Sequence, residues 1–237
     1  MFERPHHQRI AKVLQVLDGP LLRDKHCLFG GGTAMALRFG EYRESVDIDF
    51  LVSDISSYRD LRQLLTGSGG LAAITQKDAP PLVQAREVRA DQYGIRTMLL
   101  VAGQPIKFEI ILEGRIALAA ATAEDDICGV ATLVPLDMAT GKLLANSDRW
   151  ADDGVFSRDV IDLAMMNARL PLLKQAVSKA QAAYGQAILR DLEKALLRLQ
   201  TRHGWLERCM LVMAMNLPKA VLWQRLRALR RLLPKAV

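Results

Sequence analysis

Two aspartates, Asp47 and Asp49, have the type and spacing that most directly suggest chemistry in this 237-residue chain. They alternate with Val46, Ile48 and Phe50, which is the period of two expected of a β-strand with one apolar face. Two carboxylates on the other face repel each other, and a divalent cation such as Mg²⁺ or Mn²⁺, shared with substrate phosphates, would stabilise them. An isolated Asp-x-Asp is more often the solvated face of an edge strand, so the metal interpretation needs a second motif.

A glycine-rich turn upstream is that second motif. Gly30, Gly31 and Gly32 follow a short apolar segment, and glycine lets the backbone turn sharply and approach a ligand without a Cβ in the way. Thr33 is predicted to be the N-cap of a helix over 34–39. Because free N–H groups at a helix N-terminus bind phosphate, a phosphate-binding turn is predicted shortly before a metal-binding pair, as a nucleotide-handling site requires.

Together the two motifs resemble the AbiEii/AbiGii nucleotidyltransferase toxin family, a branch of the DNA polymerase beta type nucleotidyltransferase superfamily. The matching residues are Gly31-Gly32-Thr33-Ala34 and Arg43-x-Ser45-x-Asp47-Ile48-Asp49-Phe50. The resemblance implies that Asp47 and Asp49 bind metal ions. It also implies that Ser45 lines the metal site or donates to the triphosphate, which Gly31, Gly32 and Thr33 cradle.

The superfamily site also needs a third carboxylate from a neighbouring strand, which completes the metal shell and can accept a proton from the attacking hydroxyl. A strand is predicted over 106–113, with Lys107, Glu109 and Glu113 on its polar face. Glu109 is the predicted third carboxylate and metal ligand. Glu113 is the alternative if Glu109 is only a solvated strand residue.

The chain is predicted to form an α/β (α+β) fold with two domains. Residues 1–134 form the nucleotidyltransferase domain, a mixed sheet flanked by helices, and residues 135–237, whose pattern is helical from Pro135 nearly to the end, form a C-terminal helical domain. The first predicted helix, over 6–17, carries His6 and His7, which we interpret as exposed and without a role.

The helical domain contains further matches to the family. Its members carry a lysine near the start of this region and an aspartate in an Arg/Lys-Asp-x-x-Asp-Leu pattern, which correspond to Lys142 and Asp159. The resemblance implies that Lys142 neutralises phosphate charge, with a solvent-exposed helix lysine as the alternative, and that Asp159 orients Lys142 or the acceptor. Asp162 is interpreted as a structural residue that pairs with Arg158 or with a helix N-terminus.

Charge and cysteine content narrow the location and the partners. Residues 187–237 contain 11 Lys and Arg against 3 Asp and Glu, so this segment carries the basic excess of a chain whose net charge is +6. An RNA partner and a solvated basic helix face explain that excess equally well. Three widely spaced cysteines without zinc spacing suit a reducing cytoplasm. No signal peptide or membrane-length apolar run is expected.

The resemblance implies an enzyme that transfers a nucleoside monophosphate from a nucleoside triphosphate (NTP) to an acceptor hydroxyl and releases pyrophosphate. RNA, such as a tRNA end, is the expected acceptor. A toxin–antitoxin or phage-defence role is implied, with a cognate antitoxin encoded nearby as a partner. Two alternatives remain open: the same chemistry on a small molecule or protein hydroxyl, and a nucleotide- or RNA-binding module without catalysis.

Overall fold

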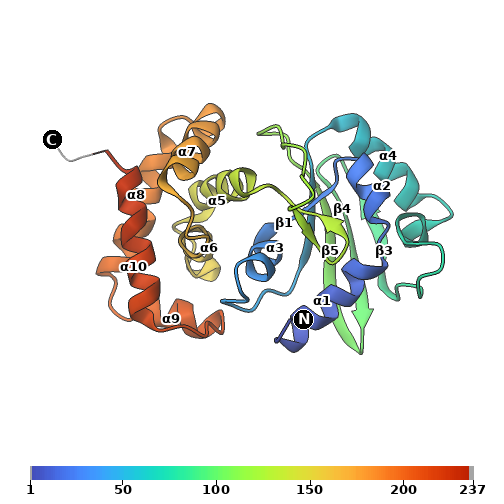
Figure 1. Ribbon diagram of the computed structural model, residues 1–237, viewed down its shortest axis with the longest axis horizontal. Helices are drawn as coiled ribbons and strands as arrows, with labels where there is room; N and C mark the ends of the chain where they lie inside the picture. Colours follow the sequence, from blue (N-terminus) through green and yellow to red (C-terminus); the bar gives the residue numbers. More distant parts are fainter. Residues whose placement is uncertain (1, 235–237) are drawn as a thin grey trace. The chain divides into compact units, whose positions relative to one another are not determined.

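The computed structural model describes residues 2–234, which divide into two compact units (Figure 1). Of the described residues, unit 1 comprises 2–41 and 45–134, and unit 2 comprises 42–44 and 135–234. A single boundary after residue 134 therefore does not describe Tyr42–Glu44. These residues belong to unit 2 because the buried side chains of Tyr42 and Arg43 bond to an aspartate of that unit.

Unit 1 combines helices with a mixed sheet. Its helices are α1 (Pro5–Val16), α2 (Gly19–Asp24), α3 (Gly31–Arg38) and α4 (Ile55–Thr66), followed by the 3₁₀ turn η1 (Gly70–Ile74). Its strands are β1 (Leu28–Gly30), β2 (Ile48–Val52), β3 (Gln84–Ala90), β4 (Gly94–Val101), β5 (Gln104–Leu112), β6 (Asp126–Ile127) and β7 (Val130–Ala131).

The main sheet has five strands in the order β1-β2-β5-β4-β3, with β2 and β5 parallel and the other neighbours antiparallel. Its register places Asp49 of β2 opposite Glu109 of β5, Glu109 opposite Arg96 of β4, and Arg96 opposite Arg89 of β3. Residues directly opposite each other share a face of a sheet. These four charged residues therefore form one row on one face, which we call the polar face.

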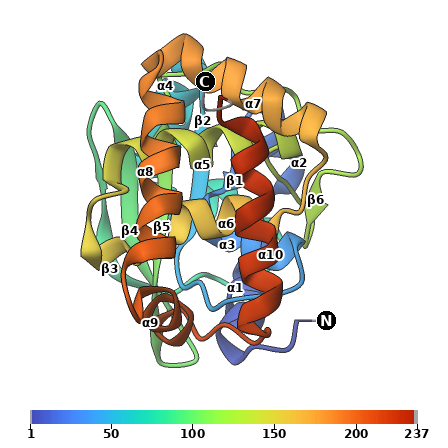
Figure 2. The same ribbon diagram turned by 90° about the vertical axis from the view of Figure 1, so that its left-hand side faces the viewer.

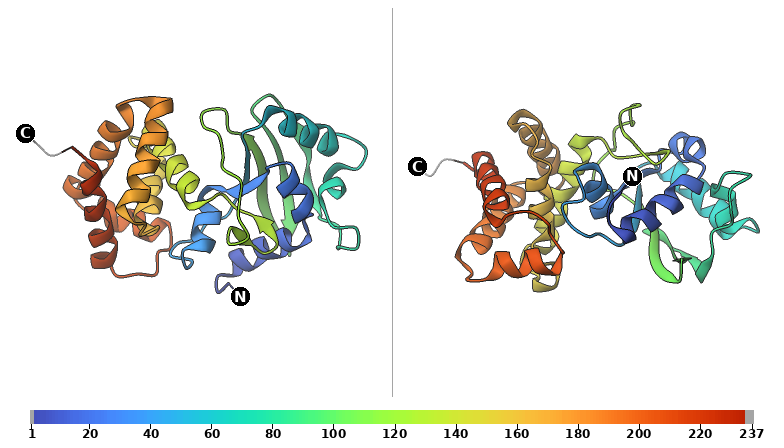
Figure 3. Two further views of the ribbon diagram at one scale, coloured as in Figure 1. Left: turned by 45° about the horizontal axis from the view of Figure 1, so that its top comes forward. Right: turned by 60° about the horizontal axis from the view of Figure 1, so that its bottom comes forward.

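The other face of the sheet is the core of unit 1. Ile48, Phe50, Phe108 and Ile110 are buried there, and the rings of Phe50 and Phe108 lie 5.7 Å apart. Helices α1, α2 and α4 lie on this side of the sheet and α3 lies on the other side (Figures 1 and 3). Helix α3 contacts β1 and β2, so it covers only that end of the polar face.

Strand β2 is shorter than the alternation of residues predicts. It begins at Ile48, and Val46 is exposed rather than buried, so the prediction that Val46 faces the core is wrong. The pairing of β2 with β1 ends at Asp49 and its pairing with β5 begins at Ile48, so Val46 is not paired in the sheet. Asp47 therefore lies immediately before the strand that carries Asp49.

Unit 2 is helical and is built around its first helix. It contains α5 (Pro135–Arg149), η2 (Asp153–Val155), α6 (Arg158–Met165), α7 (Leu170–Tyr184), α8 (Ala187–Thr201), α9 (Trp205–Val212), α10 (Lys219–Leu229) and η3 (Arg230–Leu232). Helix α5 packs against α6, α7 and α8, and α10 packs against α6. Figure 2 shows α5 and α6 behind α8 and α10. Within residues 2–234, no helix has both the length and the apolar character needed to cross a bilayer.

Candidate active site

The turn between β1 and α3 lies directly against Asp49. Gly30 is paired with Asp49 in the sheet, and Gly31 has a φ of 67°, in the left-handed region that favours glycine. A Cβ on Gly31 would overlap with the Oδ2 atom of Asp49. Glycine is therefore required at position 31 both for the backbone conformation and for the close approach of the carboxylate.

Helix α3 begins earlier than predicted. Gly30 is its N-cap and Gly31 its first residue, so Thr33 lies in the first turn and the prediction that Thr33 is the N-cap is wrong. The flexible glycines let the helical turn start two residues upstream of Thr33. The Thr33 hydroxyl instead donates to the Ser45 hydroxyl at 2.8 Å. The N–H groups of Gly31, Gly32 and Thr33 are among those that have no partner within the helix.

A buried histidine holds the backbone of Ser45. The Ser45 N–H donates to Nε2 of His7 at 3.1 Å, and Nδ1 of His7 lies 2.7 Å from a carboxylate oxygen of Glu41. Since Nε2 accepts a hydrogen bond, Nδ1 is the nitrogen that carries the ring hydrogen, and its N–H donates a hydrogen bond to Glu41. Burial raises the pKa of Glu41, but hydrogen bonds from the Glu3 N–H, His7 and the Arg4 N–H outweigh it and lower that pKa.

The prediction that both histidines are exposed and without a role is wrong. His7 is completely buried, and the half-buried His6 contacts the carbonyl oxygen of Val46 at 3.0 Å. The signal was present in the sequence, because His7 lies three residues before Ile10 and seven before Leu14, on the apolar stripe of α1.

Glu109 is buried and engaged by two cations. Its carboxylate accepts from Nε of Arg96 at 2.9 Å and lies 2.6 Å from Nζ of Lys107. It is therefore not a solvated strand residue. Glu113, the alternative third carboxylate, is also buried, and Arg115 donates to it from both its backbone N–H and its guanidinium.

In unit 2, Lys142 is buried between two aspartates. Its Nζ lies 3.1 Å from Asp159 and 2.6 Å from Asp162, so the alternative of a lysine that reaches solvent is wrong. Arg149 also donates to Asp159, at 2.7 Å and 3.0 Å. Burial raises the pKa of Asp159, but the charges of Lys142 and Arg149 outweigh it and lower that pKa.

Asp162 is the most enclosed residue of this cluster, and its main partner is Arg43. Arg43 donates to both Asp162 oxygens, at 2.6 Å and 2.9 Å, and the Tyr42 hydroxyl donates at 2.7 Å. The prediction that Asp162 pairs with Arg158 or a helix N-terminus is therefore wrong. Burial raises the pKa of Asp162, yet Arg43 and Lys142 together hold it below its usual range.

Comparison with known families decides the identity of the chain. The model of the family described as nucleotidyl transferase AbiEii toxin, type IV toxin–antitoxin system, matches residues 16–227. The chain belongs to this family. It is therefore a nucleotidyltransferase toxin of the AbiEii type, and the predicted family and enzyme class are confirmed.

Two solved structures are similar to this chain, and the first of them bears on its fold. The chain is similar to a "putative nucleotidyltransferase from H. pylori", with a TM-score of 0.51 and 18% identity over 96% of this chain and 94% of that one. It is also similar to JHP933 from Helicobacter pylori, with a TM-score of 0.46 and 18% identity over 96% and 91% of the two chains. The first likeness confirms the predicted fold of a mixed sheet flanked by helices. A search among curated proteins finds no match.

Nucleotidyltransferases generally use an NTP and a divalent metal, and the carboxylates of unit 1 are the candidate metal ligands. Asp47 and Asp49 are half-buried and supply the oxygen donors that Mg²⁺ and Mn²⁺ prefer. Glu109 already carries two cationic partners. Among the described residues, no three His, Cys, Asp or Glu side chains are grouped so as to hold a metal ion. The two aspartates thus fit a metal ion. Glu109 could join them as a third ligand only if it exchanged Arg96 and Lys107 for the metal.

Arg43 is the AbiEii motif residue whose position the sequence did not explain. It lies in the matching Arg-x-Ser-x-Asp segment, yet it is buried in unit 2 with Asp162. Nothing in the local pattern indicates a partner 119 residues away. The nearest signal was that both Arg43 and Asp162 lie in segments that match the family.

Proposed function

We propose that this AbiEii-type enzyme transfers a nucleoside monophosphate from an NTP to a hydroxyl of RNA. The observation that carries the proposal is the direct approach of the Gly31 turn to the Asp49 carboxylate. Within unit 1 it sets the N-terminus of α3, which could bind a phosphate, beside a carboxylate of the kind that binds Mg²⁺. A structural strand with a solvated acidic face does not require a glycine in a left-handed conformation against its carboxylate.

Asp47 and Asp49 are the proposed metal ligands, with Glu109 as the third carboxylate. A bound Mg²⁺ or Mn²⁺ would neutralise phosphate charge and position the NTP for in-line attack. The proposal assigns Glu109 a further role as acceptor of the proton from the attacking hydroxyl. That role requires Arg96 and Lys107 to release its carboxylate oxygens, which both cations now contact.

The proposed triphosphate contacts are the N–H groups of Gly31 and Gly32 together with the Thr33 and Ser45 hydroxyls. The Thr33 hydroxyl donates to Ser45, which leaves the Ser45 hydroxyl hydrogen to donate to a phosphate oxygen. His7 holds the Ser45 N–H, and so it fixes the backbone from which that hydroxyl projects. These contacts orient the NTP without any covalent step by the protein.

Lys142 is proposed to offset negative charge on the leaving pyrophosphate, and Asp159 to hold Lys142 in place. In this cluster Lys142, Arg43 and Arg149 pair with Asp159 and Asp162, and the charge of Asp148 also acts on Arg149. Lys142 would therefore have to exchange an aspartate partner for the phosphate. Asp162 has a supporting role in this scheme, because Arg43 and Tyr42 occupy its oxygens.

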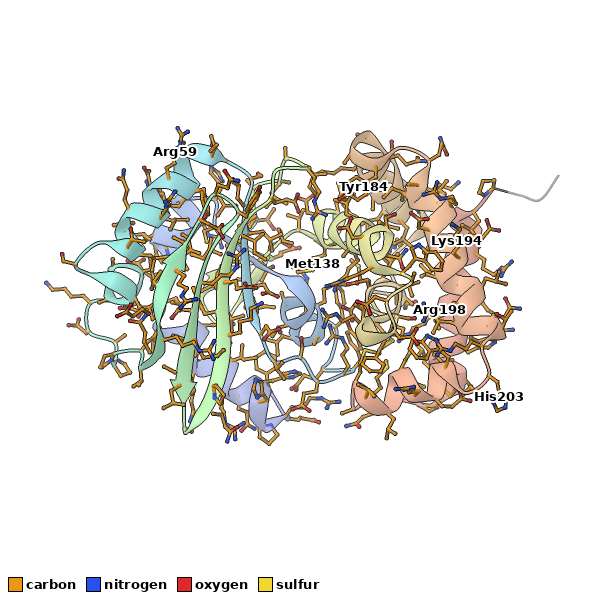
Figure 4. All side chains as sticks on the ribbon, turned by 180° about the vertical axis from the view of Figure 1, so that it is seen from behind. Arg59, Met138, Tyr184, Lys194, Arg198 and His203 are labelled. Carbon is orange, nitrogen blue, oxygen red and sulfur yellow. The ribbon has the colours of Figure 1, made fainter. Side chains whose placement is uncertain are left out.

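The basic C-terminal segment is weaker support for an RNA acceptor than its charge suggests. Arg198 and Arg202 pair with Asp153, and Arg225 donates to the Met165 carbonyl oxygen. Figure 4 labels Lys194 and Arg198, which are both on α8. Lys194 lies 5.2 Å from the centre of the Trp150 ring, and Arg198 donates to the Trp150 carbonyl oxygen. Much of this charge therefore stabilises unit 2 itself.

The transfer reaction can be tested with purified protein, each α-³²P-labelled NTP in turn, Mg²⁺ and total bacterial RNA, followed by gel electrophoresis. We expect label in a tRNA-sized band with the wild type and none with Asp47→Ala. Exposed Arg59→Ala serves as a control that keeps activity, since this residue lies on α4 away from the motifs. Label on protein or on a small molecule instead of RNA would refute the acceptor, and binding of NTP without transfer would refute catalysis.

A further inference from the structure

A groove of about 560 Å³ lies over β3, β4 and β5, and its lining is unusually basic. Four of its lining side chains are cationic, one is anionic and two are uncharged. The seven are Arg86, Glu87, Arg89, Arg96, Thr97, Met98 and Lys107. All belong to unit 1, so the groove is complete within that unit.

The groove continues the row that contains the proposed metal ligands. Asp49, Glu109, Arg96 and Arg89 are opposite one another on four neighbouring strands. Lys107 is opposite Met98, and Met98 is opposite Arg86, in the next row of the same face. Because neighbouring strands are about 4.8 Å apart, Arg89 lies roughly 14 Å from Asp49 across the sheet. An anionic chain along this face would therefore reach the carboxylates at one end.

Two of the groove cations lack counter-ions. Arg86 and Arg89 are exposed and form no ion pair with any of residues 2–234. Arg96 and Lys107 share Glu109, and Arg96 also contacts Asp91 at 2.9 Å. The groove thus carries an excess of positive charge that attracts a polyanion, and guanidinium groups match phosphate oxygens in a bidentate geometry.

The groove lining also indicates which part of a nucleic acid would bind. It contains no aromatic side chain on which a base could stack. Its cations are spaced along and across strands, which suits successive phosphates of one backbone rather than a single small anion. We propose that this groove binds the phosphodiester backbone of the RNA acceptor and leads its reactive end towards Asp49. The proposal rests on the proposed function, because it takes RNA to be the acceptor.

Arg86→Ala/Arg89→Ala tests the proposal without disturbing the core, since both side chains are exposed. The matched control is Arg59→Ala/Arg62→Ala, which removes two exposed arginines of α4 in the same unit. A charge-preserving Arg86→Lys/Arg89→Lys variant separates loss of charge from loss of side-chain volume. The full-length protein is titrated into fluorescent tRNA at several salt concentrations, without NTP, and binding is followed by anisotropy.

Two lost phosphate contacts should reduce the slope of log Kd against log salt by about 1.4 to 1.8. We expect affinity at 0.1 M salt to fall on the order of tenfold or more in the alanine variant. The control should keep the wild-type slope, and the lysine variant should keep most of it. An unchanged slope and affinity in Arg86→Ala/Arg89→Ala would overturn the proposal. The proposal would also be overturned if poly-L-glutamate binding depended on both arginines and RNA binding did not. That result would indicate an acidic protein as the occupant of the groove.

Nucleotide transfer to the same tRNA, measured in parallel, separates failure of the groove from failure of the function. Asp47→Ala should keep RNA affinity and lose transfer. If the wild type transfers label and the alanine variant binds RNA normally, only the groove assignment fails. If the wild type binds RNA through Arg86 and Arg89 but transfers no nucleotide, the proposed function fails and the RNA acceptor role of the groove fails with it.

Discussion

Replacing Asp162 with asparagine removes one charge from the centre of unit 2 and almost no volume. Four donor atoms now reach the Asp162 oxygens: Nε and a terminal nitrogen of Arg43, the Tyr42 hydroxyl and Nζ of Lys142. Asparagine offers a single acceptor oxygen and turns its amide N–H groups towards these cations. Lys142 keeps Asp159 as a partner, so the loss falls mainly on Arg43.

The expected cost follows from the burial of this pair. Removing one partner of a buried ion pair costs about 3–5 kcal/mol, because the other charge stays buried without compensation. Because Lys142 retains Asp159, we expect the low end, about 3 kcal/mol. With an m value of about 1–3 kcal/mol per molar urea, the unfolding midpoint should fall by roughly 1–3 M. Such a change is a large part of the 5–15 kcal/mol that is typical of folded domains.

Tryptophan fluorescence during urea unfolding measures this cost in unit 2 alone, because Trp150, Trp205 and Trp223 all lie in that unit. Glu193→Gln, an exposed change of the same type on α8, should shift the free energy of unfolding by less than about 0.5 kcal/mol. A loss of less than about 1 kcal/mol for Asp162→Asn would refute the reasoning. It would mean that water already screens the charges of Arg43 and Lys142.

The stability of the same variant should depend on pH in a way that follows from the lowered pKa of Asp162. Burial raises this pKa, but the charges of Arg43 and Lys142 outweigh burial and lower it. A carboxylate with a lowered folded-state pKa adds stability above its unfolded value of 3.8. That stability is lost as the pH falls from 3.8 towards the folded-state value. The stability difference between wild type and Asp162→Asn should therefore be constant from about pH 5 to 7 and should narrow below about pH 4. A difference that grows on acidification would contradict this sign.

Three further predictions concern unit 1. Gly31→Ala should abolish transfer because its Cβ would overlap with Asp49. Gly40→Ala, which is also at positive φ but in open space, should keep activity and destabilise the fold by only about 1–2 kcal/mol of backbone strain. Transfer assays and thermal unfolding distinguish the two variants. His7→Ala should lower the free energy of unfolding by about 2–3 kcal/mol and remove most of the transfer rate, because the Ser45 N–H loses its buried acceptor. Equal transfer rates in the wild type and the variant would exclude a role of His7 in positioning Ser45. Chelation of divalent metal with EDTA should stop transfer and leave the tryptophan-detected unfolding of unit 2 unchanged, since the proposed metal ligands lie in unit 1. A lower urea midpoint for unit 2 in EDTA would indicate a metal in that unit.

The short-range features of unit 1 could be predicted from the sequence. Alternation indicated β2 around Ile48 and Phe50, and the glycine run indicated the turn before α3. The ends of these elements could not be predicted in the same way. Val46 continues the alternation but is exposed and not paired in the sheet, and the N-cap of α3 depends on the conformation that Gly30 and Gly31 adopt in space.

Long-range polar partners were the features that the sequence did not reveal. His7 and Ser45 are 38 residues apart, and Arg43 and Asp162 are 119 apart. The type of a residue indicates what it can bind, but only the folded chain brings its partner within hydrogen-bond distance. The family resemblance predicts a role for Lys142, yet its burial between two aspartates depends on the packing of α5 against α6.

The most direct test of the proposed reaction is its stoichiometry on one purified tRNA. Pyrophosphate released and nucleotide incorporated are measured in the same samples for the wild type and for Asp49→Asn, which keeps the volume of the carboxylate beside Gly31. We predict one pyrophosphate for each nucleotide added to RNA with the wild type, and neither product above background with Asp49→Asn. Undiminished transfer by Asp49→Asn, or pyrophosphate released without labelled RNA, would contradict the proposed function.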